Sequence, residues 1–431
     1  MQNDKSFVDS VPESTISPES SAHQAHLSAQ NPAPLKKPRL NAKLLRRIFV
    51  AASIRRWNDQ ACPVEFVELD KQAHKMVIAY LFAKYEECEG GEIDWERLIE
   101  YFCFDFFERV VLTDIKPPVF HELQRYHRKE FAHFVISELQ SDLGEYEFFD
   151  DMEHYFKHPP QHIEKQILQA AHYYASKWEF DIIYHFNPYM FDVGNIKAII
   201  DKEVERHYNL HGMKQMVLFK QIGEIVTMFG QLRFQKRWSQ TPRVPATSVL
   251  GHTLVVALCG YLLSLDLGAC RQMRINHFLG GLFHDLPEIL TRDIISPIKT
   301  SVAGLDEQIK AIEARAVEEK ILAHLPESMR TDIIYFTQNE FANRYKIEDF
   351  THYTKDSVEL FASYNSDEYN PVCGEFLKAC DHLSAFLEAR ISIAHGISSA
   401  DLIQGAQGIL DKRKDMVVNG LDLGALFREF V

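Results

Sequence analysis

The residues best able to carry out chemistry in this sequence lie in one short segment, GGLFHDLPEILTRDIISPIK, at residues 280–299. The segment places His284 beside Asp285 and follows them with Glu288 and Asp293, directly after the apolar run FLGGLF. One ionisable group at the end of a buried helix is ordinary. Because unpaired charges are costly in an apolar interior, four such groups together indicate a site.

A divalent metal ion is the ligand that these residue types favour. Metal sites for hydrolysis combine neutral imidazoles with carboxylates from different elements and keep one position open for water. His252 opens an apolar segment, and Asp381 lies between the stretches LKAC and HLSAFL. The predicted ligands are therefore His252, His284, Asp285 and Asp381. The alternative for Asp381 is a salt bridge to a lysine or arginine.

Two carboxylates after the His-Asp pair are candidates to activate the attacking water and to contact the substrate. Glu288 lies four residues after His284, on the same face if the helix continues. It is a candidate to orient or deprotonate the attacking water. Asp293 follows a predicted turn and is a candidate to hold a substrate hydroxyl or to protonate a leaving group.

Arg237, Trp238 and Lys299 are candidates for substrate binding. Arg237 and Lys299 supply positive charge and hydrogen-bond donors to a phosphate, and Trp238 offers a ring for stacking on a base. The alternatives are a core position for Trp238 and a plain surface position for Lys299. His277 lies seven residues before His284 on the same apolar segment and is interpreted as a structural histidine.

Helices are the elements that must position these residues. Apolar residues recur at three- and four-residue spacing in HTLVVALCGYLLSL, INHFLGGLFHDLPEIL and EFLKACDHLSAFLEARI, and in comparable stretches of the N-terminal half. Strand-like alternation is scarce, so the predicted architecture is all-α, a helical bundle. Pro287 predicts that a helix ends or kinks just after His284.

The N-terminal half repeats the order of these residues. The pair Arg56–Trp57 resembles Arg237–Trp238, and both pairs precede a polar loop and an apolar helix. The alignment places His74, Phe104, Asp105, Glu108 and His172 opposite His252, His284, Asp285, Glu288 and Asp381. Since phenylalanine cannot bind a metal, the first copy is interpreted as degenerate and the second as intact. The alternative is chance similarity between helical segments.

The repeat predicts the division of the chain. Residues 1–35 are rich in Ser, Pro, Gln, His and Asn and are expected to be a disordered tail. Residues 36–215 are expected to form a degenerate helical copy, and residues 216–431 the intact copy. The second copy is expected to carry an insertion between about residues 300 and 365.

The composition excludes some function classes. The formal net charge of −14 argues against general nucleic-acid binding through a basic face. The seven cysteines form no CxxC pair and indicate reduced thiols of a cytoplasmic protein. The longest apolar run, TLVVALCGYLLSL, is shorter than the roughly 20 residues that span a bilayer, so no membrane is expected.

One basic segment stands out against this acidic background. Residues 36–56 contain eight basic residues and no acidic one. The segment is interpreted as a solvated helix face. The alternative is a contact with an anion or RNA.

The pattern of His252, His284–Asp285 and Asp381 resembles the HD-domain superfamily of metal-dependent phosphohydrolases. The stretch HDxxExxTxDxxxPxK from His284, with the Arg-Trp pair before it, is similar to the bacterial 5′-deoxyribonucleotidase-like branch. The resemblance covers about residues 220–400. It implies a divalent ion (Mn, Co, Mg, Fe or Zn) on the four predicted ligands, a homodimer, and a small phosphorylated substrate met by Arg237 and Trp238. It also implies that Glu288 activates water and that Asp293 contacts the sugar.

The sequence departs from that family at the residue before the first histidine. The family usually has an acidic residue there, and this chain has Gly251. The preceding loop, TPRVPATSVLG, also differs. Both departures concern the identity of the substrate more than metal binding.

The predicted function is hydrolysis of a phosphate ester, most readily a nucleoside 5′-monophosphate or a related nucleotide, by attack of a metal-bound water. The alternative is a non-catalytic sensor that binds a nucleotide and metal. A purely structural scaffold would not explain the clustering at residues 280–299.

Overall fold

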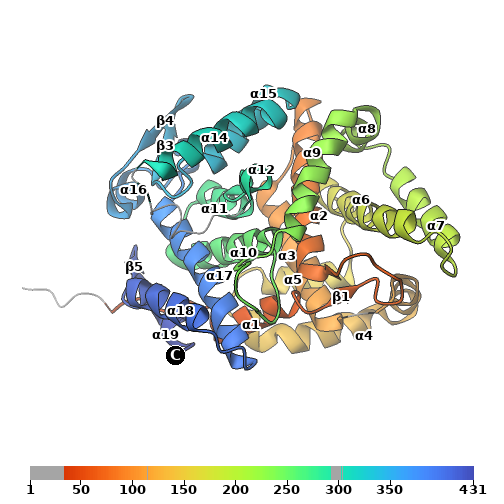
Figure 1. The fold of residues 1–431 in the computed structure, drawn as a ribbon, viewed down its shortest axis with the longest axis horizontal. Helices are drawn as coiled ribbons and strands as arrows, with labels where there is room; N and C mark the ends of the chain where they lie inside the picture. Colours follow the sequence, from red (N-terminus) through yellow and green to blue (C-terminus); the bar gives the residue numbers. More distant parts are fainter. Residues whose placement is uncertain (1–33, 114, 293–301, 303) are drawn as a thin grey trace, which may run out of the picture. The chain divides into compact units, whose positions relative to one another are not determined.

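The computed structural model describes residues 34–113, 115–292, 302 and 304–431. These residues are mainly α-helical, with only short antiparallel hairpins among them, which confirms the predicted all-α class (Figure 1). The predicted disordered tail lies almost entirely outside the described residues.

The N-terminal half contains these elements: α1 (Ala42–Val50), β1 (Arg55–Arg56), β2 (Phe66–Val67), α2 (Glu68–Cys88), α3 (Trp95–Leu112), α4 (Pro117–Leu143), α5 (Phe149–Lys157), α6 (Ile163–Phe186), α7 (Val193–Glu205), α8 (His211–Leu218) and α9 (Lys220–Gln231). The short strands β1 and β2 pair antiparallel, with Arg56 opposite Phe66.

The C-terminal half contains these elements: a 3₁₀ turn (Leu232–Phe234), α10 (Val249–Leu267), α11 (Arg271–Phe283), α12 (Glu288–Thr291), α14 (Leu305–Lys320), a 3₁₀ turn (Leu322–His324), α15 (Glu327–Thr337), β3 (Arg344–Ile347), β4 (Phe350–Tyr353), α16 (Ser357–Ser363), a 3₁₀ turn (Asp367–Tyr369), α17 (Gly374–Ala394), α18 (Ala400–Arg413), β5 (Val417–Val418), β6 (Leu421–Asp422) and α19 (Gly424–Arg428). The β3–β4 hairpin, α14, α15 and α16 fall within the segment expected to be inserted.

The helix α10 is the central element of the fold (Figure 1). It packs against α2, α11 and α17. Its sequence is apolar on all sides, and nearly all of its residues are buried, as expected for a helix in the middle of a core. Ser248 caps its first turn by accepting a hydrogen bond from the Gly251 amide, and Gly268 ends it with a φ of 70°. α10 thereby fixes where His252 can lie.

The length of α10 corrects one expectation. The helix extends the apolar run to 19 residues, so by length and composition it could cross a bilayer, and the expectation that the run is too short was wrong. However, 94% of its most apolar window is buried within the protein. That burial is what a core helix shows.

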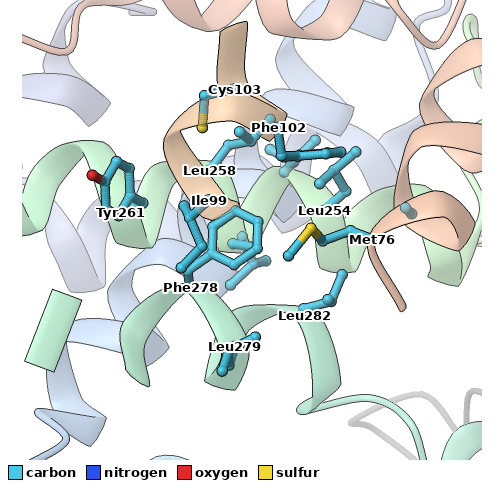
Figure 2. Close-up of a cluster of buried hydrophobic side chains, with 14 of the residues drawn as sticks. Met76, Ile99, Phe102, Cys103, Leu254, Leu258, Tyr261, Phe278, Leu279 and Leu282 are labelled. Carbon is cyan, nitrogen blue, oxygen red and sulfur yellow. The ribbon is translucent and has the colours of Figure 1, made fainter. Parts of the chain in front are cut away.

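The two halves share a hydrophobic core. Figure 2 shows Met76 of α2 and Phe102 of α3 meeting Leu254 of α10 and Phe278 of α11. The rings of Phe102 and Phe278 are 5.9 Å apart. Accordingly, Lys36–Val431 form one compact unit. The division into residues 36–215 and 216–431 stays a prediction.

The predicted repeat has a counterpart in hydrogen bonding. Trp57 Nε1 donates to Glu179 Oε2 at 2.9 Å, and Trp238 Nε1 donates to Glu388 Oε2 at the same distance. Both tryptophans have positive φ, 57° and 55°. Each glutamate lies seven residues after the position matched in the repeat, His172 or Asp381. These correspondences support a tandem arrangement, which remains a proposal.

The helix starts change one pairing within the repeat. Val67 precedes α2 as Ser248 precedes α10, so Lys71 and His252 each lie four residues into their segments. His74 lies almost one turn later, where its Nε2 is 2.9 Å from the Val226 carbonyl. The match of His74 to His252 was therefore wrong. It paired two histidines by residue type, whereas the helix starts pair His252 with Lys71.

Most basic side chains of residues 36–56 form ion pairs with carboxylates of the same chain. Arg39 pairs with Asp266 at 2.6 Å, Arg47 bonds to Asp142, and Arg56 pairs with Glu68 at 2.8 Å. These partners are buried carboxylates. The positive charge in this segment thus neutralises carboxylates on other helices, which differs from both the solvated face and the anion contact considered above.

Candidate metal centre

α10 supplies His252 from its first turn. The imidazole is fully buried. Its Nδ1 lies 2.9 Å from Ser384 Oγ, and its Nε2 lies 3.0 Å from Asp381 Oδ1. Because Ser384 engages Nδ1, Nε2 is the ring nitrogen that faces the other candidate ligands.

The end of α11 supplies His284 and Asp285. α11 ends at Phe283, and Pro287 immediately precedes α12, so the predicted interruption near Pro287 is confirmed. His284 Nδ1 lies 2.8 Å from the Gly281 carbonyl, to which it can only donate. The buried Nε2 makes no hydrogen bond among the described residues and lies 3.3 Å from Asp285 Oδ1.

α17 supplies Asp381. Its side chain is 19% exposed, and its Oδ1 pairs with His252 rather than with a lysine or arginine within the described part of the chain. The salt bridge considered as its alternative is thus replaced by contact with another candidate ligand. Segments of α10, α11 and α17 therefore bring the four candidate ligands together, and their role as metal ligands stays a prediction.

These groups fit a divalent metal ion. Ligand atoms of His252, His284 and Asp285 all lie within 4.8 Å of one another. Both histidines have Nδ1 engaged, which leaves Nε2 as a lone-pair donor, and His284 Nε2 is buried without a hydrogen bond to any residue that the structure describes. Imidazole and carboxylate ligands suit several divalent ions. Asp381 borders the same set through His252.

Electrostatics within the set favour positive charge. Burial lowers the pKa of His284, but the carboxylates of Asp285 and Asp381 outweigh burial and raise it to about 9. Burial raises the pKa of Asp285, but His284, Arg237 and His252 hold it well below its usual value. Without a metal, His284 therefore keeps a proton to balance the carboxylates.

Arg237 lies beside the candidate ligands. Its Nη1 is 3.6 Å from Asp285 Oδ2, and its Nε is 3.8 Å from Glu388 Oε2. Its backbone N–H donates to Thr247 O at 3.0 Å, which ties it to the residue before the cap of α10. The guanidinium is thus held at the edge of the centre between two carboxylates.

Glu388 is a site residue that the sequence reasoning missed. It is 2% exposed, and it accepts hydrogen bonds from Trp238 Nε1 at 2.9 Å and Thr247 Oγ1 at 2.7 Å. The cations of Arg243 and Arg237 outweigh burial and hold its pKa well below its usual value. A signal was available, because Glu388 lies seven residues after Asp381 and so on the same face of α17.

Trp238 lies at the edge of the site and also packs against a neighbouring helix. Its ring lies against α18, where a Cβ on Gly405 would approach it to 2.6 Å. With its indole N–H on Glu388, Trp238 has the core contacts of the alternative interpretation. Contact with a nucleoside stays a prediction.

Some of the remaining candidates lie within the described residues and others do not. Glu288 is buried at the start of α12. Asp293 and Lys299 lie outside the described residues. His277 contacts Ser264 Oγ at 2.6 Å and accepts from the Cys373 amide at 3.0 Å, which confirms it as a satisfied structural histidine.

Comparison with known proteins identifies the C-terminal half. A family model described as an HD domain matches residues 229–410. A 5′-deoxynucleotidase of Photobacterium profundum is 30% identical over 161 residues, which cover 36% of this chain and 79% of that protein. The chain belongs to the HD-domain family. All four predicted ligands lie within the matched HD domain.

Two further relatives of the HD domain show the extent of the similarity. A 5′-deoxynucleotidase of Vibrio atlanticus is 31% identical over 117 residues, 26% of this chain and 60% of that protein. The 5′-deoxynucleotidase YfbR of Shigella flexneri serotype 5b is 28% identical over 171 residues, 38% of this chain and 81% of that protein. No solved structure matches the chain. Residues 36–228 lie outside the matched HD domain.

Proposed function

We propose that this protein is a metal-dependent phosphohydrolase that cleaves a nucleoside 5′-monophosphate or a related nucleotide. The observation that carries the proposal is the convergence of His252, His284 and Asp285, with Asp381 beside them, in one buried centre. The names of the relatives, each a 5′-deoxynucleotidase, support the substrate class.

The four converging residues would hold the metal ion. When bound, a divalent ion supplies Lewis acidity, which makes water a better nucleophile and neutralises charge on a phosphoryl oxygen. The residues of the chain do the rest. Ser384 and the Gly281 carbonyl hold the two imidazoles with Nε2 directed to the centre.

Arg237 is proposed to bind the phosphate. Its guanidinium is fixed between Asp285 and Glu388, so it needs little reorganisation to donate to an incoming anion. Lys299 is proposed to assist it, and Trp238 to border the nucleoside. Since Glu388 also accepts from Trp238, one buried carboxylate orients both substrate-side residues.

Glu288 is proposed to take the proton from the attacking water, and Asp293 to contact the sugar. Glu288 lies four residues after His284 at the start of α12 and is 8% exposed. A carboxylate can act as a general base when it lies within hydrogen-bond reach of the proton that it takes. A cytoplasmic location and a homodimer remain predictions.

The test is phosphate release from nucleoside and deoxynucleoside 5′-monophosphates with Mn²⁺, Co²⁺ or Mg²⁺. Glu288→Gln is expected to keep its metal and to lose about 100-fold or more in kcat. Asp381→Asn is expected to lose both metal and turnover. Asp401→Ala, an exposed aspartate at the start of α18, is the control and is expected to match the wild type.

The outcome separates the two functions considered. Turnover that is lost in both site variants and kept in the control supports the hydrolase. Stoichiometric bound metal without turnover of any nucleotide would contradict the hydrolase and favour a nucleotide sensor.

A further inference from the structure

The N-terminal half touches the cap of the helix that carries His252. Asp70 of α2 is 2% exposed, and its Oδ1 accepts a hydrogen bond from Ser248 Oγ at 2.6 Å. Ser248 Oγ in turn accepts from the Gly251 amide at 2.9 Å. A hydroxyl has a single hydrogen. Because Ser248 directs that hydrogen to Asp70, its lone pairs are turned toward the first turn of α10.

Gly251 makes this contact sterically feasible. A Cβ at this position would lie 2.8 Å from Asp70 Oδ1, closer than real Cβ atoms come, and 3.0 Å from Leu69 Cδ2, which is a tight contact. The missing side chain lets a carboxylate from the other half lie against the start of α10. There the positive end of the helix dipole favours a negative charge.

The cap determines where His252 lies. His252 directly follows Gly251, and its backbone N–H donates to Ser248 O at 2.9 Å. Its side chain extends from this same turn to Ser384 and Asp381. A rotation of the first turn would move Nε2 away from the other candidate ligands.

We infer that Asp70 is a positioning residue for His252, through which the N-terminal half holds the metal centre of the C-terminal half in place. The inference rests on the proposed function only in that His252 holds a metal ion. Asp70 is not itself one of the four candidate ligands. It acts through Ser248 and the first turn of α10.

The first test compares two buried carboxylates of the N-terminal half. Asp142 is 5% exposed and pairs with Lys43 and Arg47, so Asp142→Ala reports the general cost of removing such a group. Asp70→Ala and Asp142→Ala are both expected to lower the Tm. Only Asp70→Ala is expected to weaken Co²⁺ binding, by about tenfold, and to change the visible absorption spectrum of the Co²⁺ protein.

Equal Co²⁺ affinity in Asp70→Ala and the wild type would overturn the inference, as would an equal loss in Asp142→Ala. If Asp70→Ala does not fold, Asp70→Leu replaces it, because leucine fills the space of the aspartate but cannot accept the hydrogen bond from Ser248. The same outcomes then apply to its spectrum and affinity. A wild type that binds no Co²⁺ would instead contradict the proposed function.

The second test moves the carboxylate across the interface. Asp70→Gly removes it, and Gly251→Asp in the same chain restores a carboxylate in the space that Asp70 leaves. The double variant is expected to recover most of the Co²⁺ affinity that Asp70→Gly loses. A double variant no better than Asp70→Gly would show that a carboxylate at this place does not position His252.

Discussion

Ser384 determines which nitrogen of His252 faces the centre. Its hydroxyl lies 2.9 Å from Nδ1, and both side chains are fully buried. Ser384→Ala is expected to weaken metal binding about tenfold, because the imidazole loses the bond that fixes its tautomer and orientation. Ser384→Thr, which keeps the hydroxyl, is expected to restore binding in a metal titration.

Ser392 provides the control for this prediction. It is equally buried on α17, but its Oγ accepts from the Val244 amide at 2.9 Å, away from the imidazoles. Ser392→Ala is expected to lower stability and to leave metal affinity unchanged. Equal affinities in the two alanine variants would show that Ser384 has no part in orienting His252.

The sequence pointed to the four candidate ligands but not to the residues that hold them in place. We selected His252, His284, Asp285 and Asp381 as candidates because burying an unpaired ionisable group in an apolar stretch is costly. Ser384 and Glu388 were missed because their roles depend on contacts with α10 and the loop before it, which local patterns do not reveal. Their spacing of three and seven residues from Asp381 was the available signal.

The approach of α11 to α10 depends on Gly281. A Cβ at Gly281 would lie 2.7 Å from the Ala257 backbone nitrogen, which cannot move aside without shifting α10. Gly281→Ala is expected to destabilise the fold by about 1–3 kcal/mol despite the better helix propensity of alanine. It is also expected to weaken metal binding, since the Gly281 carbonyl contacts His284 Nδ1. Denaturant unfolding and a metal titration measure the two effects.

The neighbouring glycine is the matched control. A Cβ on Gly280 would approach the end of the Leu377 side chain to 3.0 Å, which can give way, and would lie in ordinary contact with Phe336 at 3.9 Å. Gly280→Ala is therefore expected to be milder in both measurements. If both variants behave alike, the close contact of Gly281 with the α10 backbone is not what sets the position of α11.

Helices were predictable from apolar spacing, and the end of α11 from Pro287. The β3–β4 hairpin was not, because four-residue strands offer too short an alternation to recognise. The register of the repeat was misjudged at His74 because a histidine match is conspicuous, whereas Lys71 resembles His252 only in its position after the helix start.

One metal ion per chain is expected for the whole molecule. In the N-terminal half, Lys71 Nζ lies 2.5 Å from His172 Nδ1, and Lys75 Nζ lies 2.9 Å from Asp105 Oδ2. The side-chain nitrogens of two buried lysines thus contact His172 and Asp105, the residues that the repeat matches to the candidate ligands Asp381 and Asp285. Elemental analysis is expected to give about one metal per chain for the wild type and for Asp105→Asn, and none for Asp285→Asn. Two metals per chain would contradict this reading of the repeat.

The interface between the halves is expected to respond to pH through Glu100. Its carboxylate on α3 accepts a hydrogen bond from Tyr261 on α10 at 3.1 Å. Burial, and then the charges of Glu96, Asp151 and Asp94, raise the pKa of Glu100 to about 7 from an ordinary 4.5. Between these two values the folded chain holds a proton that the unfolded chain has released. Glu100 therefore makes stability rise as the pH falls from 7 toward 4.5, and it costs stability in full above pH 7.

Glu100→Gln removes this ionisation while keeping an oxygen that can accept from Tyr261. The variant is expected to unfold with a free energy about 1–2 kcal/mol higher than the wild type at pH 8, and the gain is expected to shrink at pH 5. Denaturant unfolding of both proteins at the two pH values measures it. A gain of the same size at both pH values would mean that the amide packs better for reasons unrelated to charge. A gain that shrinks at pH 5 would show that the ionised carboxylate of Glu100 lowers the free energy of unfolding at high pH. The contact between α3 and α10 would then be stronger with a neutral group at this position.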